Sequence, residues 1–156
     1  MEITTEIIIH AARLGNAPVL EEIIESGADI NVQDQKGYTP LIIACYNGHY
    51  NAAKLLLDNG ARVNAFDFGG NTALMGASFK GYYEIAKLLI DNGADLNLQH
   101  GNGGTAIMFA AMFGRNELVK LLHSYGADTT IVDSRGLSVI DLAAQQGNQE
   151  AIDILS

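Results

Sequence analysis

The chain is poor in cysteine and in basic side chains, and each shortage excludes a class of function. Cys45 is the only cysteine among 156 residues, so neither an internal disulfide nor a cysteine metal cluster can form. Lysine and arginine number 9 against 18 aspartates and glutamates, which gives a formal charge of −9. Such a charge repels phosphate backbones and anionic lipid surfaces. We therefore expect no nucleic-acid partner and no membrane partner.

Long apolar runs are missing as well. No run approaches the roughly 18 residues that a membrane span needs. Residues 1–14 contain no basic stretch followed by a long apolar segment, so we expect a cytoplasmic protein. A hydrophobic content of 48% is nevertheless enough to bury a continuous core, and the composition predicts a folded chain.

What the sequence does have is a period of 33 residues. Asp34, Asp67, His100 and Asp133 are each 33 residues apart. A fixed period of this length is typical of a stacked array of small units and not of a globule with one central core. The same spacing recurs in Gly37, Gly70, Gly103 and Gly136, in Thr39, Thr72, Thr105 and Ser138, and in Ala44, Ala77, Ala110 and Ala143.

The most regular unit, residues 34–66, predicts two short helices. Thr39 is a candidate N-cap and Pro40 occupies the first helical position, where its missing N–H costs nothing. We expect a helix over residues 40–47, a second helix over 51–59 that buries Ala53, Leu55 and Leu56, and an extended hairpin over 61–69. Neither helix is long enough to be stable alone, so successive units must bury each other's faces.

These motifs resemble the ankyrin repeat. The resemblance is carried by Gly37-x-Thr39-Pro40-Leu41, Ala44, Gly48-His49, Lys54-Leu55-Leu56-Leu57 and Asn59-Gly60-Ala61-x-Val63-Asn64. It implies an all-α ankyrin-repeat solenoid of antiparallel helix pairs joined by β-hairpin loops, forming a single domain over residues 1–156. The expected division is an N-terminal capping repeat at 1–33, full repeats at 34–66, 67–99 and 100–132, and a C-terminal capping repeat at 133–156.

Polar residues in the outer units support the capping assignment. Glu21 and Glu22 occupy the positions of Lys54 and Leu55, and Asp141 occupies the position of Met108. Polar groups are expected where no further unit covers them, so the sequence predicts a complete array.

No group of residues indicates catalysis or ligand binding. The loop His-Gly-Asn-Gly-Gly-Thr at 100–105 superficially resembles a phosphate-binding loop, but it lacks the required lysine and coincides with the hairpin of every unit. The four histidines are never spaced i, i+4 as a helical metal site would need. The recurring aspartates fit turns, where a carboxylate accepts backbone N–H groups. We predict no enzyme, no cofactor and no metal site.

The resemblance implies that a partner protein is bound on the concave face, which is made by the hairpin tips and the exposed side of each first helix. Tyr46, Phe79 and Met112 form a column there, one unit apart, and exposed aromatic residues are typical interface anchors. The alternative is that these three side chains pack between the helices as extra core. The candidate partner-binding residues are Arg13, Lys36, Tyr38, Tyr46, Asn47, Phe68, Asn71, Phe79, Lys80, Met112, Phe113 and Arg135.

The charge of these candidates is one-sided, since they include four cations and no acid. This predicts a partner protein whose contact surface is apolar with an acidic rim. We expect a monomer that acts, when it binds, as an adaptor or as an inhibitor of the immunity-protein type. Two alternatives stay open: a small-ligand or anion-responsive regulatory subunit that uses the loop at 101–104, and a purely structural spacer.

One residue departs from the pattern of the first helices. Gly76 stands where the other units have Ile43, Phe109 and Leu142. Glycine inside a helix costs about 1 kcal/mol relative to alanine. We hypothesise that Phe109 of the next unit fills the space that Gly76 leaves, so that leucine at this position would overpack the core.

Overall fold

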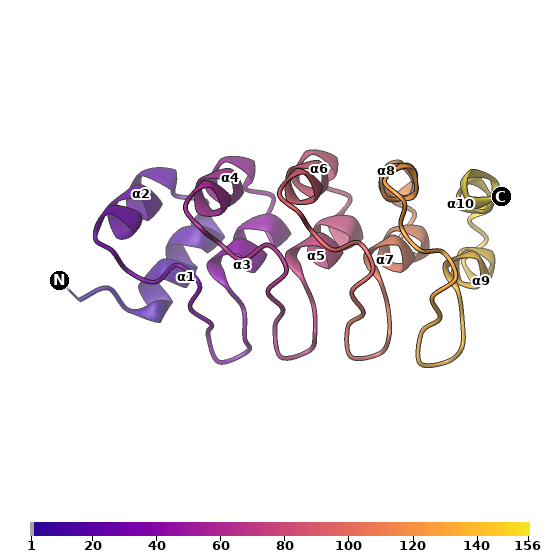
Figure 1. Cartoon of the computed structure of the whole chain (residues 1–156), viewed down its shortest axis with the longest axis horizontal. Coiled ribbons are helices and arrows are strands. Elements are labelled where there is room, and N and C mark those ends of the chain that lie inside the picture. The colour runs from indigo at the N-terminus through magenta and orange to yellow at the C-terminus, as the bar shows by residue number, and fades with distance from the viewer. Residues whose placement is uncertain (1) are drawn as a thin grey trace.

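The structure is a computed structural model that describes residues 2–156, and these form an elongated stack of helix pairs (Figure 1). The odd-numbered helices lie in one row and the even-numbered helices in a second row. The connections between pairs project from the edge of the first row as long loops. The helices are α1 (Thr5–Leu14), α2 (Ala17–Glu25), α3 (Pro40–Tyr46), α4 (Tyr50–Asp58), α5 (Ala73–Lys80), α6 (Tyr83–Asp91), α7 (Ala106–Met112), α8 (Asn116–Ser124), α9 (Val139–Gln145) and α10 (Gln149–Leu155).

The start of α3 confirms the capping prediction. The Thr39 hydroxyl accepts a hydrogen bond from the Ile42 N–H at 3.1 Å, and Pro40 is the first helical residue. Helix α4 begins at Tyr50 and ends at Asp58, one residue before the predicted range at each end. Leu55 was predicted to be buried but is half-buried, because it lies at the edge of the face that α4 packs against its neighbours.

The core runs without a break between the two rows. Ala44, Ala77, Ala110 and Ala143 are completely buried where neighbouring first helices meet, and the absence of a larger side chain lets these helices approach closely. Each helix packs on its own partner and on the next helix of its row, so stability comes from contacts between adjacent units. Cys45 is also fully buried, and burial raises the pKa of its thiol to about 12.

Each projecting loop contains a tight turn, and neighbouring loops are hydrogen-bonded to one another. Successive loops are joined by single backbone bonds, from Phe68 N–H to Lys36 O at 3.1 Å and from Gly101 N–H to Gly69 O at 2.9 Å. The β-pairing within residues 2–156 consists of one isolated antiparallel bridge, between Phe66 and Thr72. The loops therefore hold a fixed position beside the first helices.

Candidate functional site

All twelve predicted partner-binding residues lie on the odd-numbered helices, at the ends of those helices or in the loops, and none is buried. The structure therefore places them along the row of odd-numbered helices and its loops, the part of the molecule that the sequence analysis expected to be the concave face. The exposed members are Arg13, Lys36, Tyr46, Asn47, Phe68, Phe113 and Arg135, and the half-buried members are Tyr38, Asn71, Phe79, Lys80 and Met112.

Three aromatic rings form a continuous row on this face, which we call the aromatic ladder: Tyr46, Phe79 and Phe113. The Tyr46 and Phe79 rings are stacked with centroids 6.3 Å apart, and Phe79 meets Phe113 edge-on at 4.5 Å. The predicted third member, Met112, is half-buried against the core instead. Helix α7 ends at Met112 as α3 ends at the equivalent residue Tyr46, and it is the C-cap residue Phe113 that places its ring beside Phe79.

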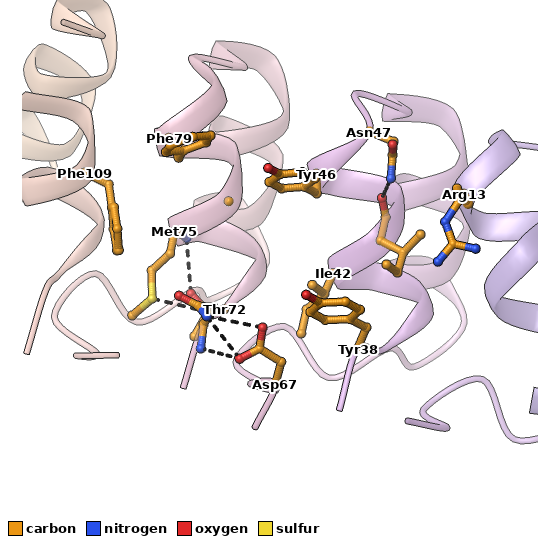
Figure 2. A pocket seen from close by; sticks show the side chains of 13 residues that line it. Arg13, Tyr38, Ile42, Tyr46, Asn47, Asp67, Thr72, Met75, Phe79 and Phe109 are labelled. Carbon is orange, nitrogen blue, oxygen red and sulfur yellow. Dashed lines mark hydrogen bonds between the residues drawn. The ribbon is translucent and has the colours of Figure 1, made fainter. Parts of the chain in front are cut away.

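A cavity of about 470 Å³ opens beside the ladder (Figure 2). Tyr46 and Phe79 border one side of it, and Asp67 and Thr72 lie on the opposite side. The apolar part of the lining comes from α3, α5 and α7 through Ile42, Ile43, Met75, Gly76 and Phe109. These lining residues were not predicted from the sequence. The glycine at position 76 was the available signal.

The hypothesis that Phe109 fills the space left by Gly76 is wrong. A methyl group built on Gly76 would meet only the Tyr46 side chain within 4 Å, at 3.5 and 3.9 Å. The Phe109 ring lies against His100 instead, with centroids 5.0 Å apart. The space therefore stays open as part of the cavity.

Asp67 is the one acidic residue that lines this cavity, and its carboxylate is used by the turn. It accepts hydrogen bonds from the Gly69 N–H at 2.8 Å, from the Asn71 N–H at 2.9 Å and from the Asn71 side-chain amide at 3.2 Å. Only 5% of the residue is exposed. Its capacity as an acceptor is thus largely satisfied within the protein (Figure 2).

The cations near the ladder have no acidic partner within the described residues. Arg13 lines the cavity, and the Lys80 ammonium lies 4.7 Å from the centroid of the Tyr46 ring, a cation–π distance. Neither forms an ion pair in this part of the chain. By contrast, Lys54 on α4 binds Asp58 at 3.0 Å and Lys87 on α6 binds Asp91 at 3.2 Å.

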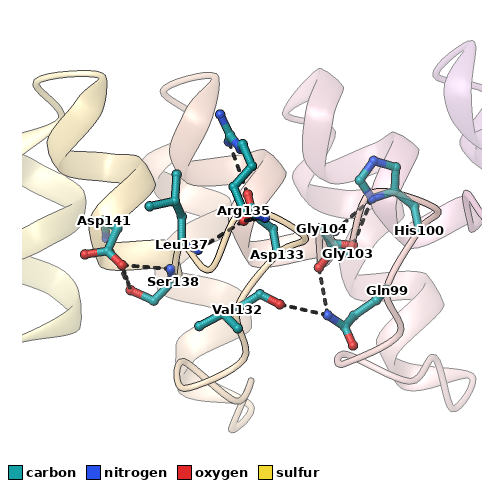
Figure 3. A network of polar contacts seen from close by, with 10 residues as sticks. All are labelled: Gln99, His100, Gly103, Gly104, Val132, Asp133, Arg135, Leu137, Ser138 and Asp141. Atoms are coloured by element: carbon teal, nitrogen blue, oxygen red, sulfur yellow. Dashed lines mark hydrogen bonds and ion pairs between the residues drawn. The ribbon is translucent and has the colours of Figure 1, made fainter.

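Arg135 differs from the other predicted cations. Its guanidinium binds Asp133 at 3.1 Å (Figure 3). The pKa of the Asp133 carboxyl is lowered, chiefly by the hydrogen bond from the Leu137 N–H and also by those from Arg135. Arg135 therefore has less free charge to offer a partner than Arg13 or Lys80.

The backbone N–H groups of the glycine-rich loop at 100–104, except that of Asn102, donate hydrogen bonds within the protein. The Gly101 N–H donates to Gly69 O, and the Gly103 N–H donates to His100 O at 2.7 Å. The Gly104 N–H donates to His100 Nδ1 at 2.9 Å (Figure 3). A second cavity of about 350 Å³ adjoins this loop and α7. An anion-binding loop needs several successive free N–H groups, so a loop with one such group gives the anion-responsive alternative no support.

Within the described part of the chain, no three His, Cys, Asp or Glu side chains come together in an arrangement that could hold a metal ion. None of the helices is both long enough and apolar enough to cross a membrane.

Comparison with known proteins adds two similarities. The profile of a protein family described as Ankyrin repeats (3 copies) matches residues 8–100 and 87–156. A segment of 49 residues is 41% identical to the protein named Ankyrin repeat protein nuc-2 of Neurospora crassa. That segment covers 31% of this chain and 5% of the relative, so the relative's remaining length has no counterpart in the match.

Proposed function

The chain belongs to the ankyrin repeat family, and we propose that it is a non-catalytic module that binds a partner protein through its concave face. Ankyrin repeats are in general protein–protein interaction modules, and proteins of the family are typically non-catalytic. The observation that carries the proposal is the aromatic ladder. Tyr46 is 43% exposed and Phe113 is 46% exposed beside a cavity of about 470 Å³, and contiguous apolar surface of this kind marks interaction sites.

The charges on this face support a partner whose contact surface is apolar with an acidic rim. Arg13 lines the cavity beside the ladder, Lys80 lies over the Tyr46 ring and Lys36 lies in the loop before α3. None of the three forms an ion pair among the described residues. Complementary charge speeds encounter and selects partners more than it adds affinity. An inhibitor of a nucleic-acid-binding enzyme would need acids here, so we favour an adaptor, or an inhibitor of another class of protein.

The domain organisation forms part of the same proposal. We place full repeats at 34–66, 67–99 and 100–132, with capping repeats at 1–33 and 133–156, in a chain that is a monomer when unbound. Support comes from Glu21 and Glu22 on α2 and from Asp141 on α9, which are all exposed.

Affinity capture with two matched triple variants tests the proposal. The ladder variant carries Tyr46→Ser, Phe79→Ser and Phe113→Ser. The control variant carries Tyr50→Ser, Tyr83→Ser and Tyr125→Ser, which removes three aromatic residues, 39%, 37% and 48% exposed, from the ends of the even-numbered helices.

We expect the control to retain a partner protein that the ladder variant loses, with both variants keeping helical circular dichroism. Equal recovery by the wild type and the ladder variant would refute binding through this face. Loss in the control alone would place the interface on the even-numbered helices.

A further inference from the structure

Gly76 lies in the interior of α5, although neither its backbone conformation nor its neighbours require a glycine there. Its backbone φ is not positive, so the helix does not need glycine there. An added methyl group would meet Tyr46 at 3.5 Å, which is ordinary van der Waals contact. Nevertheless, glycine in a helix interior destabilises the helix relative to alanine. A cost without a structural benefit suggests that the benefit lies in function.

The effect of the missing side chain is to keep the cavity open. The equivalent residues Ile43, Phe109 and Leu142 all carry large side chains, whereas Gly76 adds no side chain to the cavity of about 470 Å³ that it borders. That volume lies within the range of about 300 to 1,000 Å³ typical of pockets that enclose a bound group. A branched or longer side chain at position 76 would enter this space beside Tyr46.

The lining indicates which group would bind. The aromatic residues Tyr46, Phe79 and Phe109 line the cavity. Aromatic rings favour stacked and edge-on contacts with another ring. The lining is therefore best matched by an aromatic side chain.

The charges at the cavity indicate what should surround that aromatic side chain. The Asp67 carboxylate already accepts hydrogen bonds from the N–H groups of Gly69 and Asn71, so it does not need a cation from a ligand. Arg13 lines the cavity and Lys80 lies over the Tyr46 ring, and neither has an acidic partner in the described part of the chain. An acidic side chain next to the inserted group would complement both cations.

We propose that Gly76 opens a socket for one aromatic side chain carried by an acidic segment of the partner protein. This inference rests on the proposed function and deepens it, because it assigns the anchor residue and its neighbours. The occupant is a segment of another protein and not a second copy of this chain.

The test uses the full chain and a library of random short peptides displayed on phage. Peptides selected on the wild type should share one aromatic residue with acidic neighbours. A synthetic version, measured by fluorescence anisotropy, should lose affinity at least about tenfold when the aromatic residue becomes alanine and also when the chain carries Gly76→Leu. Gly76→Ala should bind nearly as well as the wild type, because one methyl group fills little of the cavity.

The matched control is Asn51→Leu, which adds the same side chain to an exposed position on α4 and should leave peptide binding unchanged. Thermal melting shows whether each variant is folded. The socket is refuted if no peptides are enriched, if the enriched peptides lack an aromatic residue, or if Gly76→Leu binds them as tightly as the wild type. Dimerisation of the wild type that Gly76→Leu abolishes would assign the socket to a second copy and equally refute the proposal.

Failure of the socket is distinguishable from failure of the proposed function. If the captured partner is lost by the ladder variant but retained by Gly76→Leu, concave-face binding stands and the socket does not. If both variants retain the partner, concave-face binding itself is refuted.

Discussion

Replacing Gly76 by alanine should stabilise the protein. Position 76 lies inside α5 (Ala73–Lys80), and alanine there loses less conformational freedom on folding than glycine does. The added methyl group meets the Tyr46 side chain at 3.5 Å, a distance at which no neighbour has to move. We expect the free energy of unfolding to rise by about 0.5 to 1 kcal/mol.

Thermal melting followed by circular dichroism measures this change. For a chain of this size, 1 kcal/mol corresponds to a rise in Tm of about 2 to 4 °C. Because stacked repeats can unfold in parts, urea unfolding should accompany the melt and give the same sign. Gly81→Ala is the opposite control. Gly81 has φ +79°, and an added methyl group would come within 2.8 Å of Arg115 Cδ, so this variant should be less stable than the wild type.

A lower Tm for Gly76→Ala would refute the reasoning. It would mean that Tyr46 cannot accommodate even one methyl group and that close packing requires the glycine. The argument that position 76 keeps a binding cavity open would then lose its premise, whatever the peptide experiment showed.

Three further predictions concern stability and reactivity. Thr39→Val should cost about 1 kcal/mol because it removes the cap of α3. Thr105→Val should cost little, since the buried Thr105 hydroxyl has no hydrogen-bond partner in the described structure; equal losses in urea unfolding would contradict this. Cys45, with a pKa raised to about 12 by burial, should not react with a thiol reagent at about pH 8 until the chain unfolds, and fast native labelling would show that α3 opens. Asp133 has a lowered pKa in the folded state, so its carboxylate stabilises the fold above the ordinary value of 3.8 and loses this effect as the pH falls through the folded-state pKa. The Tm difference between wild type and Asp133→Ala should therefore shrink as the pH falls toward 3, and a constant difference would contradict the assignment.

The stack of helix pairs could be predicted from the sequence because each unit repeats its own local signals. Thr39 and Pro40 set the start of α3, and the observed helices α3 and α4 differ from the predicted ranges by a single residue at their ends. Stability in such an array comes from contacts between neighbouring units. A residue repeated every 33 positions therefore has a similar environment in each unit, so the fold can be predicted from the period.

The third member of the aromatic ladder could not be predicted in this way. The period places Met112 at the position of Tyr46 and Phe79, but the Met112 side chain packs against the core, and the ring beside Phe79 is that of the next residue, Phe113. Helix length does not account for this difference, because α3 ends at Tyr46 as α7 ends at Met112, and Tyr46 belongs to the ladder. The period gives equivalent positions, and it does not report which of two adjacent side chains at a helix end contacts the neighbouring unit.

The cavity likewise depends on a contact within one unit that the 33-residue period does not predict. In three units the turn is held by aspartate, whose carboxylate accepts N–H groups two and four residues further on, as Asp67 does from Gly69 and Asn71. In the remaining unit His100 replaces it, accepts the Gly104 N–H through its ring and places that ring 5.0 Å from the ring of Phe109. Phe109 is thereby held against its own hairpin instead of over Gly76. The open space at position 76 thus results from two residues that differ from the repeat pattern, Gly76 in one unit and His100 in the next.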